Sequence, residues 1–232
     1  MIRYGVCGLF MITLICAALL ASSAWAAETD AAPAEGDLAP LDIKLPEPSY
    51  AGTPLNYWSE HLEITFKKRE PYMAPKDAVN LAKDKAVTSS AKPSVGKLPM
   101  VTDGDKSAAE ESFMELPSGI QWVQVDLGAE HELYAIVLWH YHAAERVYFD
   151  TVCQLSNDPD FIKDVKTVFN NDFDNSSKLG VGEHKEYIEG YEGKLIDVKG
   201  NKARYIRFYS NGNTSDEMNH YIEVEAYGKP AN

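Results

Sequence analysis

From Val79 onward the chain consists of short runs of β-forming residues separated by polar turns, and no long helical pattern intervenes. Apolar residues alternate in residues 122–128 and again in 149–155, as expected for strands with one buried face. Residues 133–139 are apolar on both faces, which indicates a central strand buried on both sides. Further short strands are expected at residues 166–169, 194–198, 203–209 and 221–227. This spacing predicts an all-β fold, an antiparallel β-sandwich or jelly roll.

Turn-forming residues separate the expected strands. Asn157-Asp158-Pro159, Lys199-Gly200-Asn201 and Asn211-Gly212-Asn213 are combinations that favour turns. Roughly ten polar residues, 210–220, join the last two strands, and connections of such a length commonly join neighbours. We therefore expect the last two strands to pair as a hairpin with a long loop.

The first 26 residues have the pattern of a secretory signal peptide. Arg3 supplies a positive charge, an apolar run follows, and Ala24-Trp25-Ala26 fits a small-x-small cleavage site. The apolar run is too short for a membrane anchor. A lipoprotein would use Cys16, but Ile15 precedes it where a small residue is expected. We expect cleavage after Ala26 and a secreted or periplasmic protein.

Cysteine usage sets a condition on the exported chain. Cys7 and Cys16 lie in the predicted signal peptide, so Cys153 would remain as a single thiol without an internal disulfide. The fold must then be stable through its core alone. Cys153 lies in a strand-like run, which favours a buried apolar side chain over a reactive thiol.

The charge of the chain restricts its partners. The net charge is −13, and a strongly acidic protein is repelled by nucleic acid and by anionic membranes. Neutral ligands such as glycans, and cations such as Ca²⁺, suit this charge better.

Residues 27–78 differ in composition from the rest and hold seven of the twelve prolines. Residues 27–40 are rich in Ala, Pro and acidic side chains, which predicts a disordered spacer. Residues 41–75 contain several aromatic side chains, which usually pack against something. We expect an extended Pro-rich arm that lies against a domain formed by residues 79–228.

Five motifs occur in order within residues 79–228. They are residues 80–90, the acidic loop Val101-Thr102-Asp103-Gly104-Asp105, residues 121–128, Tyr205-Ile206-Arg207 and residues 223–228. Together they resemble the discoidin, or coagulation factor V/VIII C-type (F5/8 type C), domain. The resemblance implies a galactose-binding-like jelly roll, a fold whose members include carbohydrate-binding modules, cell-adhesion domains and lipid-binding domains. The cysteine pair of many animal members is missing here, as a secreted bacterial version would explain.

The resemblance also implies a structural Ca²⁺ at the acidic loop. The ligands would be the side chains of Asp103 and Glu223 with the main-chain oxygens of Met100 and Asp105. Ca²⁺ takes six to eight oxygens, and a tight Gly turn directs several carbonyls inward. Relatives often carry a Thr where this chain has Ala108, so an Asp-Gly turn without an ion stays an alternative.

A second acidic stretch, residues 170–177, resembles half of an EF-hand loop. Asn175 stands where that loop needs Gly, and Val181 stands where it needs Glu. An ordinary solvated loop is therefore the favoured interpretation.

The segment that follows the central strand has the most chemically distinctive side chains. An aromatic platform with a few planar polar groups is typical of a sugar site. The predicted ligand-binding residues are His140, His142, Arg146, Tyr148 and Asn219, with Asn213 and His220 as further candidates. A zinc site would need a third ligand, and none occurs at a useful spacing. The alternative is that Trp139 and Tyr148 belong to the core and that the His and Arg side chains are ordinary surface.

Enzyme signatures are missing from the sequence, which has no Gly-x-Ser-x-Gly, His-Glu-x-x-His or phosphate-loop motif. The predicted function is non-catalytic recognition of a glycan or glycoconjugate at or outside the cell surface. The alternative is a structural or adhesion protein that binds another protein through its loops or its arm. A lipid-binding domain would need apolar loop tips, and the acidic charge disfavours it.

Overall fold

The computed structural model describes residues 37–49, 54, 56–63 and 67–230. The predicted signal peptide and most of the predicted spacer lie outside these residues. The end of the predicted spacer is not irregular, because Leu38–Pro40 forms strand β1. All described residues belong to one unit, residues 33–232.

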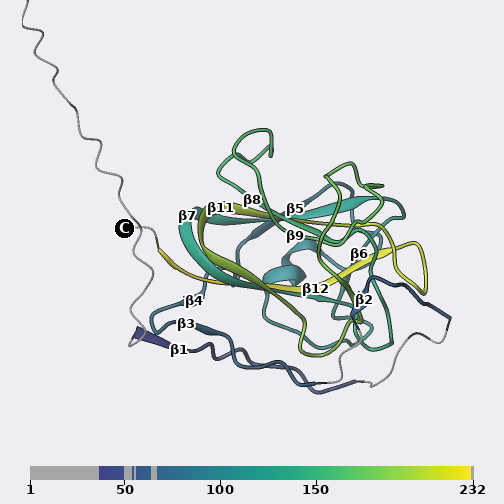
Figure 1. The fold of residues 1–232 in the computed structure, drawn as a ribbon, viewed down its shortest axis with the longest axis horizontal. Coiled ribbons are helices and arrows are strands. Elements are labelled where there is room, and N and C mark those ends of the chain that lie inside the picture. The colour runs from purple at the N-terminus through teal and green to yellow at the C-terminus, as the bar shows by residue number, and fades with distance from the viewer. Residues whose placement is uncertain (1–36, 50–53, 55, 64–66, 231–232) are drawn as a thin grey trace, which may run out of the picture. The chain divides into compact units, whose positions relative to one another are not determined.

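Strand β7 (Gln121–His140) organises the fold, because its two halves contribute to different layers (Figure 1). Its first half pairs with β5 (Ala86–Ser89) and with the second half of β11 (Lys194–Ser210). Its second half pairs with β12 (Asn219–Pro230) and with the first half of β11. β8 (Val152–Ser156) and β9 (Lys166–Asn170) extend the first layer, whereas β4 (Val79–Asn80) and β6 (Met114–Leu116) extend the second.

The strands at residues 122–128 and 133–139 are one continuous element, and so are those at 194–198 and 203–209. The predicted turn at Lys199 and Gly200 is a bulge within β11. Both residues have positive φ, 56° and 77°, and the register with β7 shifts between Asp197 and Asn201. A bulge absorbs extra residues without ending the pairing.

The prediction that the last two strands pair is wrong. In the described sheet β7 lies between them, so β11 and β12 are neighbours of β7 rather than of each other. The connection, residues 211–218, crosses from one layer to the other and is held by the isolated bridge between Tyr148 and Asn213. Loop length alone therefore did not determine which strands are adjacent.

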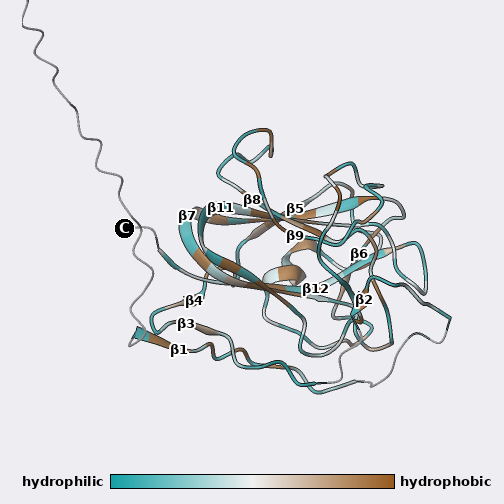
Figure 2. Ribbon diagram, in the orientation of Figure 1, coloured by the Kyte–Doolittle hydropathy of each residue, from teal (hydrophilic) through white to brown (hydrophobic). Residues whose placement is uncertain are grey.

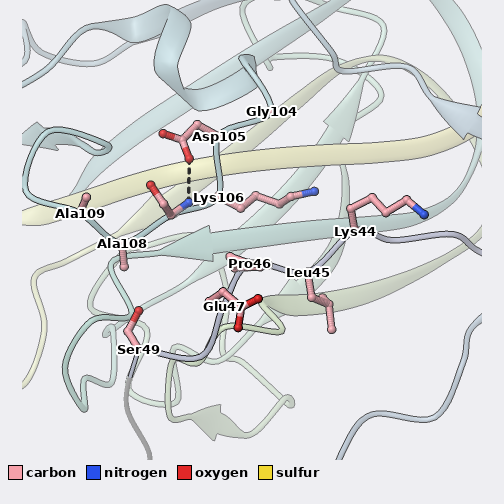
Figure 3. A pocket seen from close by; sticks show the side chains of 11 residues that line it. Lys44, Leu45, Pro46, Glu47, Ser49, Gly104, Asp105, Lys106, Ala108 and Ala109 are labelled. Atoms are coloured by element: carbon pink, nitrogen blue, oxygen red, sulfur yellow. Dashed lines mark hydrogen bonds between the residues drawn. The ribbon is translucent and has the colours of Figure 1, made fainter.

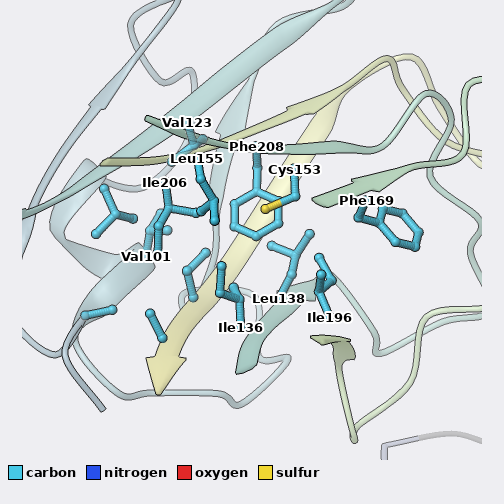
Figure 4. Packing of buried hydrophobic residues seen from close by; sticks show 14 of the residues in the cluster. Val101, Val123, Ile136, Leu138, Cys153, Leu155, Phe169, Ile196, Ile206 and Phe208 are labelled. Atoms are coloured by element: carbon cyan, nitrogen blue, oxygen red, sulfur yellow. The ribbon is translucent and has the colours of Figure 1, made fainter. Parts of the chain in front are cut away.

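The core fills the space between the two layers (Figure 4). Val123, Val125 and Leu127 are buried as predicted, and every residue from Leu133 to Trp139 is buried, as predicted for a central strand. Apolar and polar residues alternate along the strands in Figure 2. Cys153 is a buried free cysteine within this core, and burial raises the pKa of its thiol well above the usual value. The prediction of a buried Cys153 is confirmed.

The N-terminal segment packs on the outer face of the second layer. β1 pairs with β3 (Met73–Pro75), and Leu41, Ile43, Leu45 and Tyr72 lie against a cluster that includes Val137, Trp139 and Ile222. The Tyr72 hydroxyl donates to the Tyr134 carbonyl (2.9 Å) or to Asp197 Oδ1 (2.6 Å). Further along, β2 (Leu62–Glu63) pairs in parallel with β10 (Glu186–Tyr187). The segment is thus attached to the sandwich at two places.

Helical structure is limited in the described part of the chain. The short 3₁₀ helix η2 (Leu98–Thr102) precedes the acidic loop. No helix among the described residues has the length and apolar character that a membrane crossing requires.

Gly193, which directly precedes β11, is predicted to be indispensable for packing. Its φ is +64°, and a Cβ there would lie 2.6–2.8 Å from ring atoms of the buried Trp139. Gly193→Ala is expected to lower the free energy of unfolding by about 1–3 kcal/mol in urea denaturation, as overpacked core sites do. Gly190→Ala is the matched control, since a Cβ at Gly190 meets no atom within 4 Å. Equal stability of the two variants would contradict the prediction.

Candidate functional site

Three loops meet at one end of the sandwich: residues 117–120, 141–151 and 211–218. Backbone hydrogen bonds join the last two loops, from Phe149 N–H to the Gly212 carbonyl (3.1 Å) and from Thr214 N–H to the Val147 carbonyl (3.0 Å). Between the three loops lies a pocket of about 310 Å³. It is lined by Ser118, Gly119, Phe149, Asn211, Gly212, Asn213, Asp216 and Glu217.

Two buried asparagines determine the shape of this pocket. Asn213 Oδ1 accepts from the Ser215 backbone N–H (2.9 Å), and its Nδ2 donates to Asp216 Oδ1 (2.8 Å). Asn219 Nδ2 donates to the carbonyls of Pro117 (2.8 Å) and Gly119 (3.0 Å). Asn213 thus stabilises one loop, and Asn219 ties that loop to its neighbour.

Arg146 lies behind the pocket and holds one of its walls. Its Nη1 donates to Asp216 Oδ2 (3.0 Å), and its guanidinium lies 4.8 Å from the centre of the Tyr141 ring. Only 15% of the Arg146 side chain is exposed, against 36% for Asp216. Arg146 therefore fixes the orientation of a carboxylate that faces the pocket.

His220 completes the network as a neutral side chain. Burial is the main reason that its pKa is lowered, so the ring is uncharged at neutral pH. Its Nδ1 lies 3.3 Å from Arg146 Nη1, which can only donate, so Nδ1 is the acceptor and also receives the Tyr148 hydroxyl (3.0 Å). The proton is then on Nε2, which donates to Glu115 Oε2 (3.2 Å).

Four of the five predicted ligand-binding side chains are buried. His140, His142, Tyr148 and Asn219 have at most 1% of their surface exposed. His140 pairs with Glu189 (Nδ1 to Oε1, 2.7 Å) and stacks on Tyr148 at 4.1 Å, while His142 Nε2 lies 3.0 Å from the Lys106 carbonyl. The prediction that these four side chains face solvent is wrong, because each has its partners inside the protein. Arg146 stays partly exposed and acts on the pocket through Asp216.

The residues that line the pocket were not among the predicted ligand contacts, except for Asn213 as a further candidate. Phe149 was assigned to a strand and Asn211 to a turn, and Asp216 and Glu217 belong to a loop that was interpreted as a connection. The sequence signal for this site was the loop of residues 211–218, which is polar and contains two carboxylates. Only the folded chain places this loop next to Phe149.

The predicted metal residues lie beside η2. Glu223, on β12, is fully buried, and its Oε2 accepts from the Gly104 backbone N–H (3.1 Å). Its Oε1 has no hydrogen-bond partner among the described residues. Burial raises the pKa of Glu223 to about 9, and the nearby charges of Glu225 and Asp103 add to this effect.

The Asp103 and Asp105 carboxylates belong to the turn itself. Asp103 Oδ1 accepts from the Asp105 backbone N–H (2.8 Å), and Asp105 accepts from the Ser107 backbone N–H (2.9 Å) and the Ser112 hydroxyl (2.9 Å). The Lys83 ammonium contacts the Asp103 carbonyl. A buried carboxylate oxygen without a partner, next to this exposed acidic turn, fits a cation at Glu223 and Asp103. The Asp105 side chain is already engaged, which leaves its main-chain oxygen.

A larger pocket of about 590 Å³ lies between residues 44–49 of the arm and residues 104–109 of the acidic loop (Figure 3). Its two ammonium groups already have acidic partners: Lys106 pairs with Glu225 and Lys44 with Asp42, both at 2.7 Å.

A different acidic group comes together around residues 170–177. Carboxylate oxygens of Asp150, Asp172 and Asp174 all lie within 4.8 Å of one another. Among the described residues, the side chains of the predicted metal ligands Asp103, Asp105 and Glu223 do not form such a group. Burial would raise the pKa of Asp172, but hydrogen bonds from Ser177 and its neighbours lower it on balance. The expected solvated loop is only partly so: residues 174–176 are exposed, whereas Asp172 is fully buried and its Oδ2 accepts from the backbone N–H and the hydroxyl of Ser177.

No protein-family model and no curated protein matches the sequence. Solved structures do match. CpGH89 from Clostridium perfringens, in complex with its substrate GlcNAc-alpha-1,4-galactose, has a TM-score of 0.50 at 19% identity over 65% of this chain. This chain spans 15% of the length of that enzyme.

Two separate modules match over nearly their whole length. The CBM32 module of AlyQ, in complex with 4,5-unsaturated mannuronic acid, has a TM-score of 0.43 at 22% identity, over 62% of this chain and 95% of its own. A Streptococcus pneumoniae fucose binding module has a TM-score of 0.48 at 19% identity, over 64% of this chain and 97% of its own. Such identities show the fold alone. The chain therefore has the predicted antiparallel β-sandwich, a fold that it shares with the matched part of CpGH89.

Proposed function

We propose that this chain is an exported, non-catalytic module that binds a glycan in the pocket between the three loops. The observation that supports this proposal is the lining of the pocket, which combines the aromatic residue Phe149 with the polar residues Asn211, Asp216 and Glu217. An aromatic face packs against the apolar side of a sugar, while amides and carboxylates bind its hydroxyls.

The pocket is pre-organised for such a ligand. Asn213 and Asn219 are buried and hold two of its loops by hydrogen bonds, and the Arg146 ion pair fixes Asp216. Binding then costs little ordering of the protein. Because the pocket is small and open, single-site affinity is expected to be weak and to gain from a multivalent target.

The charge of the pocket indicates the class of sugar. Asp216 and Glu217 line it, and the chain as a whole carries −13. Neutral and amino sugars are therefore favoured over uronic acids. The fold shared with CpGH89, whose structure holds a sugar, is compatible with this ligand class. The alternative of a protein partner bound by the arm has less support, since Leu41, Ile43, Leu45 and Tyr72 of the arm pack on the sheet of the same chain.

We also propose a structural Ca²⁺ at the acidic loop. The Glu223 and Asp103 carboxylates and the main-chain oxygens of Met100 and Asp105 would hold it. The ion would supply positive charge beside the buried Glu223 and so stabilise the loop.

Calorimetric titration with galactose, fucose, glucosamine and GlcNAc-alpha-1,4-galactose tests the glycan proposal. At least one of these sugars is expected to bind, and Asp216→Asn is expected to weaken that binding by about tenfold or more, since a hydrogen bond to a charged group contributes about 1.5–3 kcal/mol. Asp164→Asn is the control, because Asp164 is exposed and does not line the pocket. Equal affinities of the two variants, or no binding of any glycan by the native chain, would overturn the proposal.

A further inference from the structure

Trp58 is the most exposed large apolar side chain among the described residues, with 81% of its surface accessible. Tryptophan is normally a largely buried residue because its indole gains much from leaving water. An indole that is kept in solvent on a folded surface offers a large apolar face to a ligand.

The segment that carries Trp58 is anchored. Strand β2 pairs with β10, and the Glu186 backbone N–H donates to the His61 carbonyl (3.1 Å). The Lys185 ammonium donates to the Glu60 carbonyl (3.1 Å). The His61 ring stacks on Phe173 with 3.6 Å between ring centres. Trp58 is thus presented from an ordered loop, which lowers the entropy cost of using it as a contact.

The same segment reaches the wall of the glycan pocket. The Tyr57 ring packs against Phe149 with 5.6 Å between ring centres, and Phe149 lines the pocket. The Tyr57 hydroxyl donates to Glu186 Oε1 (2.7 Å), which fixes the ring in this position. Trp58 follows Tyr57 directly, so its Cα lies about 3.8 Å from that of Tyr57. The exposed Trp58 side chain thus belongs to a segment that contacts the pocket wall and is distant from it in sequence.

We infer that Trp58 forms a second subsite, in which its indole stacks on a further sugar unit of an oligosaccharide whose first unit occupies the pocket. This inference rests on the proposed function and specifies its ligand. Two subsites require an oligosaccharide rather than a monosaccharide. Its units are neutral or amino sugars, since the acidic side chains of the pocket disfavour uronic acids. The N-terminal arm is then part of the binding surface and not only a cover for the sheet.

The inference predicts that affinity depends on ligand length. A sugar that stacks on an aromatic ring gains about tenfold in affinity from the ring contact and the apolar surface that the contact buries. Trp58→Ala is expected to weaken binding of an oligosaccharide by about this factor and to leave the affinity for the corresponding monosaccharide unchanged within about twofold. Trp58→Phe keeps a smaller aromatic face, so its affinity for the oligosaccharide should lie between those of the native chain and Trp58→Ala.

The test compares chitosan oligosaccharides with glucosamine, and GlcNAc-alpha-1,4-galactose with galactose, on the full chain and its variants. Ile162→Ala is the matched control, because Ile162 is similarly exposed at 78% and lies in the loop between β8 and β9. Acrylamide quenching of tryptophan fluorescence gives a second readout. Among the other described tryptophans Trp139 is fully buried and Trp122 is half-buried, and both stay in the variant, so the quenching that disappears in Trp58→Ala reports on Trp58. Oligosaccharides, but not monosaccharides, are expected to protect that signal.

The outcomes separate the two proposals. A loss of oligosaccharide affinity and of protection in Trp58→Ala, with Ile162→Ala like the native chain, supports the second subsite. If Asp216→Asn weakens the binding of both oligosaccharides and monosaccharides and Trp58→Ala weakens neither, the second subsite is overturned. The proposed glycan site in the pocket is then still supported. No binding of any of these sugars by the native chain overturns both. Unchanged thermal melts of Trp58→Ala and Asp216→Asn exclude misfolding as the cause of a lost affinity.

Discussion

Replacing His140 with Ala will lower the free energy of unfolding by about 3–5 kcal/mol, the range found when one partner of a buried ion pair or hydrogen-bonded pair is removed. His140 Nδ1 lies 2.7 Å from Glu189 Oε1, and neither side chain has any exposed surface. The variant leaves the Glu189 carboxylate buried without its partner. It also removes the ring that stacks on Tyr148 at 4.1 Å and contacts Tyr221.

A double-mutant cycle in urea distinguishes the pair from general loss of packing. His140→Leu and Glu189→Met should each be strongly destabilising alone, whereas the double variant should recover much of the loss, because apolar residues of similar size replace both partners. His184→Ala is the control, since His184 is an exposed histidine. Additive effects in the cycle, or a loss below about 1 kcal/mol for His140→Ala, would contradict the prediction.

Without Ca²⁺, the stability of the native chain will fall as the pH rises from about 5 to about 9. Glu223 has a pKa of about 9 in the folded protein, against an ordinary value of 4.5 for the unfolded chain. Between these values the unfolded state releases the proton and the folded state keeps it, so each pH unit favours unfolding by up to about 1.4 kcal/mol. Below the lower value both states are protonated and the effect vanishes. Glu223→Gln should remove this slope in thermal melts recorded across the pH range.

Addition of Ca²⁺ should reverse the effect in the native chain. An ion at Glu223 and Asp103 would stabilise the folded protein by about 2.7 kcal/mol at a concentration one hundred times its dissociation constant. Glu223→Gln and Asp103→Asn should lose this gain, while the exposed control variant Asp164→Asn should keep it. If the melting temperature of the native chain is the same with Ca²⁺ and with EDTA, the proposed Ca²⁺ site is contradicted. The predicted dependence of stability on pH would not be affected by that result.

The strands could be predicted because local alternation reports directly on burial. Val123, Val125 and Leu127 share a face in any strand and are all buried here. The order of strands could not be predicted in the same way. Whether β12 lies beside β11 or beside β7 depends on pairings between distant parts of the chain, and a polar connection such as residues 211–218 permits either arrangement.

The binding end of the sandwich was predictable as a region, but its individual side chains were not. The loop that carries Arg146 does border the pocket, whereas His140 and Asn219 turn inward. Their burial depends on partners that are distant in sequence, Glu189 for His140 and Pro117 for Asn219. A single sequence does not reveal such partners, so a histidine in the core and a histidine on a lectin-like surface have the same local pattern.

The packing of the arm on the second layer has a consequence for how the protein can be produced in pieces. Sequence resemblance places a domain boundary at Val79, but Leu41, Ile43, Leu45 and Tyr72, which precede it, cover Val137, Trp139 and Ile222. A fragment that begins at Val79 would carry an uncovered apolar sheet face, the kind of surface that leads to self-association and precipitation. We therefore expect a fragment that begins near Asp37, some forty residues before the boundary that the motifs suggest, to stay in solution where one that begins at Val79 precipitates.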